Sequence, residues 1–307
     1  MGKSLNIKAP RRFSDNFGDP FREILKIVDS FNQDQTTDSI HVDFKENKFS
    51  GPFYLGPLSS ILFNLKSLGQ EINIEHSSSY LTTICFPYGV QLENQSIEEI
   101  TNKLQLFTQK TYIPIIHFST DKTPNQEVLR TNIISTINTI LKEQLKLPTN
   151  IISAFYYFID ELTQNIIHHS ESVVGTIFCQ FYPEKNYVDL TICDSGKGIL
   201  QSYIDSGKFS PKSNDEAINF AIYGKSTKNL PNNESRGYGL STTRNMLVNG
   251  LKGQFLLYSG NSFFIHTNAR EEIIALPKFK FFKGNMVNLR IPVFNISDFS
   301  IYNYISH

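Results

Sequence analysis

Two long helical patterns stand directly before a series of strand patterns in the second half of the chain. Residues 127–146 and 150–170 are predicted to be helices, and strands are predicted at 176–182, 187–193, 254–258, 263–267 and 286–292. A further helix is expected at about 240–249. The helix 150–170 has one apolar stripe, formed by Ile152, Phe155, Ile159, Leu162 and Ile166. Helices grouped beside a mostly antiparallel sheet predict an α+β sandwich.

A second face of the helix 150–170 carries a carboxylate and a carboxamide. Glu161 and Asn165 are four residues apart, so they share a face one turn apart, and we expect His168 to continue it. An amide oxygen can ligate Mg²⁺, which prefers oxygen donors. A carboxylate can accept a proton from an attacking water or hydroxyl. A solvated helix face shows the same pair, so the pair indicates a site only together with other motifs.

Two glycine-rich segments follow. The first, 194–199, comes directly after a predicted strand, and its two glycines permit a tight bend close to a ligand. Its leading Asp194 can accept a hydrogen bond from an exocyclic amine such as that of adenine. The second, 236–240, opens a predicted helix, where backbone N–H groups and the positive dipole end favour phosphates.

As an ordered set, these motifs resemble those of the GHKL superfamily of gyrases, heat-shock chaperones, histidine kinases and MutL proteins. The run 161–170, Glu-Leu-Thr-Gln-Asn-Ile-Ile-His-His-Ser, resembles the N box, especially that of anti-sigma-factor serine kinases. Residues 194–198 resemble the first glycine box and 237–240 the second. Gly284-Asn285 resembles the third box, in which the glycine is usually followed by threonine. The resemblance implies a Bergerat-fold α/β sandwich, with helices on one face of a mixed, mostly antiparallel sheet.

The resemblance also implies ATP and Mg²⁺ as ligands and gives roles to individual residues. Glu161 would be the catalytic residue that activates a nucleophile, Asn165 would coordinate Mg²⁺, and Asp194 would read the adenine. Residues 205–236 would form a mobile lid over the nucleotide. The implied ATP-binding residues are Asn165, Asp194, Gly196, Gly198, Ile199, Lys225, Ser226, Thr227, Arg236, Gly237, Tyr238, Gly239, Leu240, Gly284 and Asn285. Of these, Gly196 and Gly198 would let the backbone approach base and ribose, and Gly237 and Gly239 would line the phosphates.

The first part of the chain reads as a smaller α/β unit. Strands are predicted at 39–44, 71–74 and 112–118, and helices at 21–31, 58–68, 77–86 and 97–108, with a loop at 45–57. The order resembles a STAS domain, the fold of anti-sigma-factor antagonists, in a degenerate form. Ser50 falls near the phosphorylated position of that family. The expected divisions are a polar segment 1–37, a STAS-like domain 38–120, an ATP-binding domain 127–293 and a tail 294–307.

The composition of the chain excludes few classes of protein, but it indicates where in the cell the protein is expected. The 29 basic and 29 acidic residues give no net charge and no footprint for nucleic acid. No stretch approaches 18 apolar residues, so no membrane span is expected. Cys85, Cys179 and Cys193 lie in apolar runs without metal-ligand spacing, and we expect reduced, buried thiols. The protein is therefore expected to be cytoplasmic.

Two functions remain open at this stage. One is a Ser/Thr protein kinase of the anti-sigma type, which would act on a regulatory partner resembling a STAS domain or a sigma factor. The other is an ATP-gated switch or slow ATPase that controls partner binding. A homodimer is implied by the resemblance alone. A histidine kinase fits poorly, because the helix before the N box contains no histidine.

Overall fold

The computed structural model describes residues 4–33, 39–76, 78–92, 95–225, 239–294 and 299–305. Its centre is a seven-stranded sheet in the order β4-β5-β6-β10-β7-β8-β9, and every pairing is antiparallel. Within the described residues the fold is α+β, as predicted, but the large sheet is antiparallel throughout and not mixed as the resemblance implied. The strands are β4 Tyr112–Ser119, β5 Val174–Tyr182, β6 Tyr187–Asp194, β7 Gln254–Gly260, β8 Ser262–Thr267, β9 Arg270–Ala275 and β10 Phe282–Pro292.

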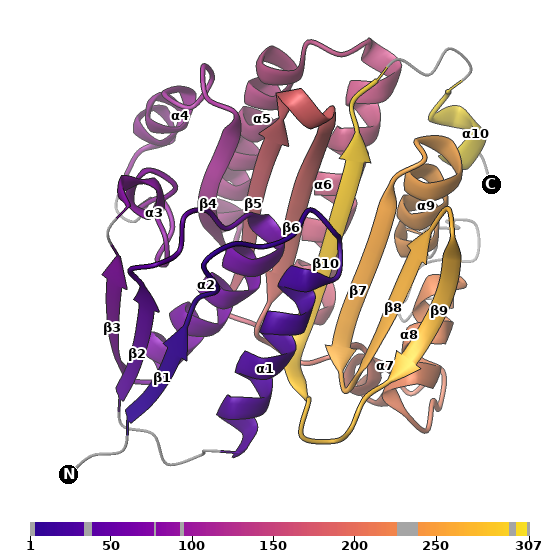
Figure 1. Ribbon diagram of the computed structural model, residues 1–307. Coiled ribbons are helices and arrows are strands. Elements are labelled where there is room, and N and C mark those ends of the chain that lie inside the picture. The colour runs from indigo at the N-terminus through magenta and orange to yellow at the C-terminus, as the bar shows by residue number, and fades with distance from the viewer. Residues whose placement is uncertain are drawn as a thin grey trace.

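One face of this sheet is covered by the helices that follow β4, which lie behind it in Figure 1. The apolar stripe of α6 is buried there, with Phe155 and Ile159 fully enclosed. The covering elements are α5 Pro124–Leu145, α6 Thr149–His169, α7 Ile199–Ser206, α8 Asn214–Ile222, α9 Gly239–Asn245 and the π-helical turn Met246–Gly250. The short elements α4 Ile97–Gln105, the 3₁₀ turn Pro183–Lys185 and α10 Tyr302–Ile305 lie at the periphery.

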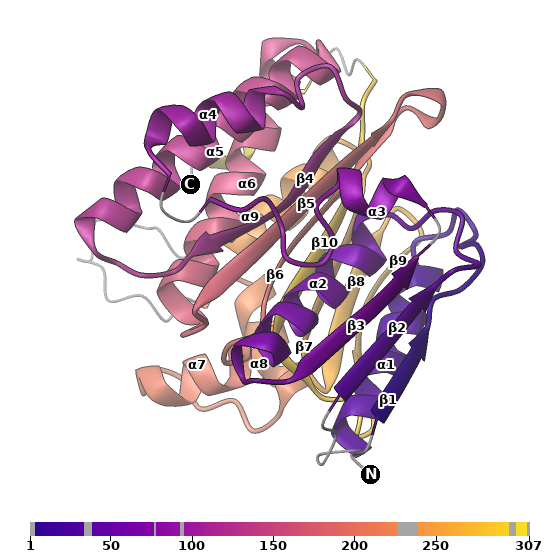
Figure 2. The ribbon, with the colours of Figure 1, turned by 90° about the vertical axis from the view of Figure 1, so that its left-hand side faces the viewer.

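The N-terminal unit covers the other face. Its three parallel strands, β1 Ser4–Lys8, β2 Ser39–Phe44 and β3 Glu71–His76, alternate with helices α1 Asp19–Gln33 and α2 Pro52–Ser67, and α3 Ser79–Thr83 follows. Helix α2 lies between the small sheet and strands β5 and β6 (Figure 2). At Gly56 the helix comes so close to β6 that a Cβ atom would lie 2.9 Å from Cγ2 of Thr191. Both sheets therefore share one apolar core around α2.

Two expectations for this region are wrong. Helix α2 begins at Pro52 rather than at 58, because proline is well tolerated in the first turn of a helix and the helix is buried on nearly all sides. Strand β4, which we assigned to the STAS-like domain 38–120, pairs with β5 as the edge of the large sheet. The large sheet thus begins before the predicted boundary at 120.

The segment that follows β6 contains the helices α7 and α8, and α8 falls within residues 205–236, which the resemblance assigned to a mobile lid. Tyr203 of α7 stacks edge-on with Phe220 of α8. The strands β1 and β9 were not predicted. None of the helices that the structure describes is both long enough and apolar enough to cross a membrane.

Candidate functional site

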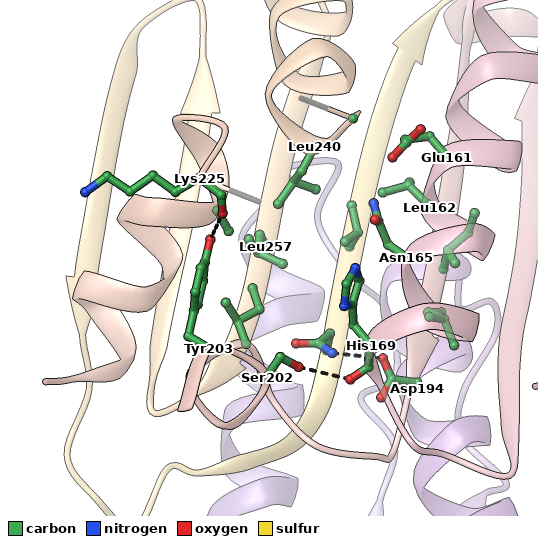
Figure 3. Close-up of a pocket in the computed structure, with 17 residues that line it drawn as sticks. Glu161, Leu162, Asn165, His169, Asp194, Ser202, Tyr203, Lys225, Leu240 and Leu257 are labelled. Carbon is green, nitrogen blue, oxygen red and sulfur yellow. Dashed lines mark hydrogen bonds between the residues drawn. The ribbon is translucent and has the colours of Figure 1, made fainter. Parts of the chain in front are cut away.

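A pocket opens between the large sheet and the helices α6, α7, α8 and α9 (Figure 3). It has a volume of about 850 Å³, which includes space open to solvent. Its apolar walls come from eight aliphatic side chains on seven elements: Leu162, Ile166, Ile192, Ile199, Ala221, Leu240, Leu257 and Val287. Its polar groups are Glu161, Asn165 and His169 on α6, and Asp194 with Asn285 where β6 and β10 meet. The structure therefore brings the predicted N box and the first and third glycine boxes to one cavity.

The polar face of α6 differs from the prediction by one residue. Glu161, Asn165 and His169 succeed one another at intervals of four, and all three line the pocket. His168, which we expected to continue this face, is exposed and does not line the pocket. The spacing of four residues from Asn165 is the sequence signal that would have indicated His169 as a pocket residue.

Asp194 lies at the end of the pocket opposite Glu161 and is fully buried. Its Oδ1 accepts a hydrogen bond from the backbone N–H of Gly196 at 2.9 Å, and its Oδ2 accepts one from Nδ2 of Asn285 at 3.1 Å. Burial raises the pKa of the carboxyl group to about 7, because the two hydrogen bonds offset only part of the desolvation of the charged form. A carboxyl group in this setting is poised between its charged and neutral forms at neutral pH.

Asn285 also holds the loop that follows Asp194. Its Nδ2 reaches the carbonyl of Lys197 at 3.2 Å, and its Oδ1 accepts a hydrogen bond from Ser259 at 2.8 Å. The same Ser259 hydroxyl accepts a hydrogen bond from the backbone N–H of Ile199 at 2.9 Å. Asn285 thus ties β7 and β10 to the segment 194–199. No sequence pattern indicated Ser259.

The glycines of the boxes are required by close packing of the chain. A Cβ at Gly284 would overlap the carbonyl of Asp194, and the φ of Gly284 is +100°, a conformation that favours glycine. A Cβ at Gly196 would overlap the carbonyl of Ser170 at the end of α6, and one at Gly198 would lie 2.8 Å from Oγ of Ser259. That Gly196 and Gly198 admit a nucleotide stays a prediction.

At the other end of the pocket, α9 begins beside Glu161. A Cβ at Gly239 would overlap the Glu161 carboxylate, so this carboxylate lies directly against the first residue of α9. Leu240, one of the implied ATP-binding residues, lines the pocket. Five predicted residues lie outside the described part of the chain: Ser226, Thr227, Arg236, Gly237 and Tyr238.

Lys225 contributes to the pocket in an unexpected way. Its side chain points away from Glu161 and Asn165 in Figure 3, and its Nζ lies 3.5 Å from the centre of the Phe220 ring, a cation–π contact. Its carbonyl instead accepts a hydrogen bond from the hydroxyl of Tyr203, a pocket residue that the sequence did not indicate. In this arrangement the Lys225 ammonium is not a phosphate contact.

Behind the site, two serines connect the sheet to the N-terminal unit. Oγ of Ser60 on α2 lies 3.0 Å from Oγ of Ser195, the residue after Asp194, and both serines are buried. Ser50, near the phosphoacceptor position of the STAS resemblance, is also fully buried and donates a hydrogen bond to Oδ1 of Asn47. Its hydroxyl is therefore inaccessible to a kinase in this conformation.

All three cysteines are free. Cys179 and Cys193 are buried, and burial raises the pKa of both thiols, which keeps them uncharged and unreactive. Cys85 is only partly buried. In comparisons with known proteins, no family model matches the chain, and a search of curated proteins finds no significant relative.

Proposed function

We propose that the pocket binds Mg-ATP and that the second half of the chain is a Bergerat-type nucleotide-binding domain. The observation that carries this proposal is Asp194, a fully buried carboxyl group that lines one end of a cavity with many aliphatic side chains in its walls. Each carboxylate oxygen accepts one hydrogen bond from the protein, from Gly196 or from Asn285, and can accept another from a ligand donor. The exocyclic amine of adenine is such a donor, and the apolar side chains of the pocket can pack against a flat ring.

The polarity of the pocket orients the proposed ligand. Adenine would lie toward Asp194, and the phosphates toward Glu161, Asn165 and the start of α9. Mg²⁺ usually takes only one or two protein ligands and completes its shell with phosphate oxygens and water. Asn165 would ligate Mg²⁺ through its amide oxygen, and the metal would neutralise negative charge on the phosphates.

For the chemistry we propose protein phosphorylation of the anti-sigma type. Glu161 would accept the proton of a Ser or Thr hydroxyl on a regulatory partner, while Asn165 keeps the phosphate end oriented. The test is incubation with Mg²⁺ and γ-labelled ATP, alone and with proteins encoded beside this one. Label on a partner Ser or Thr supports the kinase, and label on no protein despite ATP binding contradicts it.

The contact between Ser60 and Ser195 favours the second function, an ATP-gated switch. A ligand that shifts the loop after Asp194 would act directly on α2 and hence on the N-terminal unit. Ser60→Ala tests this coupling, and Ser59→Ala is its control, since Ser59 is equally buried on the same helix but contacts Pro87 and His117. We expect only Ser60→Ala to change the affinity for Mg-ATP. Equal affinities in both variants would contradict the switch.

A further inference from the structure

The loop between β9 and β10 presents two phenylalanine side chains to solvent. Phe279 is 47 % exposed and Phe281 is 45 % exposed, whereas the adjacent Phe282 is buried at the start of β10. The loop lies at the lower end of the molecule in Figure 1. Single exposed apolar residues are common, but two large ones in the same short loop indicate an interaction surface.

The backbone of this loop is fixed from behind. Nδ2 of Asn32 on α1 donates hydrogen bonds to the carbonyls of Phe279 and Phe281, each at 2.8 Å. The hydroxyl of Tyr258 on β7 donates to the intervening carbonyl of Lys280 at 2.6 Å. Three successive carbonyls are thereby held by two other elements. The fold presents the two rings on a preorganised loop, which lowers the entropy cost of binding.

The loop is also positively charged, although the whole chain has no net charge. The segment 277–283 reads Pro-Lys-Phe-Lys-Phe-Phe-Lys. Nζ of Lys280 lies 3.6 Å from the carboxylate of Asp29, so that lysine is paired. Lys278 and Lys283 are exposed and form no ion pair within the part of the chain that the structure describes. Two uncompensated cations therefore flank the two exposed rings.

From this combination we propose that the β9–β10 loop docks the protein onto an anionic bilayer surface. Aromatic rings partition into the interfacial region of a bilayer, and lysines beside them are attracted to anionic headgroups. A stable protein partner would need roughly 800 Å² on each side, more than this short loop supplies. A bilayer needs only the insertion of a few side chains. Such docking requires no membrane-spanning helix and is independent of the proposed nucleotide site.

The test uses the absence of tryptophan from the chain. In Phe281→Trp the only indole is in the loop. In the control Phe294→Trp it replaces a phenylalanine of similar exposure, 47 %, beyond the opposite end of β10. We expect phosphatidylcholine vesicles that contain phosphatidylglycerol to shift the emission of Phe281→Trp to the blue and to leave that of Phe294→Trp unchanged. Vesicles of phosphatidylcholine alone should shift neither. Absence of a shift with the anionic vesicles, or equal shifts in both variants, would overturn the proposal.

Cosedimentation with the same vesicles separates the two contributions. We expect at least a tenfold loss of binding when Phe279 and Phe281 are both replaced by Ser. Replacing Lys278 and Lys283 by Gln should remove the preference for anionic vesicles, and Phe294→Ser should bind as the parent does. Sedimentation velocity without vesicles provides the remaining check. One combination of results would contradict the proposal: the parent protein dimerises, the double Phe-to-Ser variant is monomeric, and neither protein binds vesicles. In that case the loop is an interface between copies of the chain.

Discussion

Replacing Asp194 by asparagine should change how stability depends on pH. The folded-state pKa of Asp194 is raised from 3.8 to about 7, so folding favours its protonated form. The contribution of Asp194 to the free energy of unfolding is fully present below about pH 4. It is lost as the pH rises through about 7, and above that pH the free energy no longer changes through this group. Asparagine does not titrate. The stability of Asp194→Asn relative to the parent should therefore increase by about 3 kcal/mol between pH 5 and pH 8.

The slope with pH is more diagnostic than the difference at any one pH. The carboxylate of Asp194 accepts hydrogen bonds from Gly196 and Asn285. In Asp194→Asn an amide N–H faces one of these two donors, and the loss of that hydrogen bond costs about 1 kcal/mol at every pH. All other titrating groups are common to both proteins and cancel. Urea unfolding of both proteins at pH 5, 6, 7 and 8 measures the difference. A difference that is constant with pH, or that falls as the pH rises, would refute the account of Asp194 as a buried carboxyl group with a raised pKa.

Three further substitutions test the geometry of the site. Gly284→Ala should lower the free energy of unfolding by about 3 kcal/mol, because its Cβ would overlap the backbone of Asp194. Gly207 also has a positive φ but has open space around it, so the control Gly207→Ala should lower the free energy of unfolding by only about 1 kcal/mol. Thermal unfolding of both variants measures the difference. Glu161→Gln should keep Mg-ATP affinity and lose turnover, and retained phosphate release would disprove its role as base. Gly239→Ala should displace the Glu161 carboxylate, so turnover should fall at least tenfold with little change in melting temperature.

The elements that the sequence predicted correctly are those with a strong local pattern. The strand 39–44 and the long helix that contains Glu161 lie where the periodicity placed them, because one face of each is buried. The start of α2 was missed because Gly-Pro pairs such as 51–52 and 56–57 usually mark loops, whereas here Pro52 stands in the first turn and residues 52–60 are all buried. The membership of β4 was missed because its partner β5 lies about sixty residues further along the chain.

For the candidate site, motif order predicted which residues meet, but not how they are held. Glu161, Asn165, Asp194 and Asn285 line one pocket as the resemblance implied. The anchoring of Asn285 by Ser259 could not be predicted, because it depends on the register between β7 and β10. Such contacts arise from tertiary packing and leave no local signal.

The measurement that tests the central claim most directly is isothermal titration of the parent protein and Asp194→Asn with Mg-ATP at pH 8. The account predicts saturable binding of one nucleotide per chain to the parent protein and loss of most of that affinity in Asp194→Asn, since the adenine amine loses its charged acceptor. Absence of binding to the folded parent protein, or equal affinity in the two proteins, would contradict the assignment of this pocket to ATP.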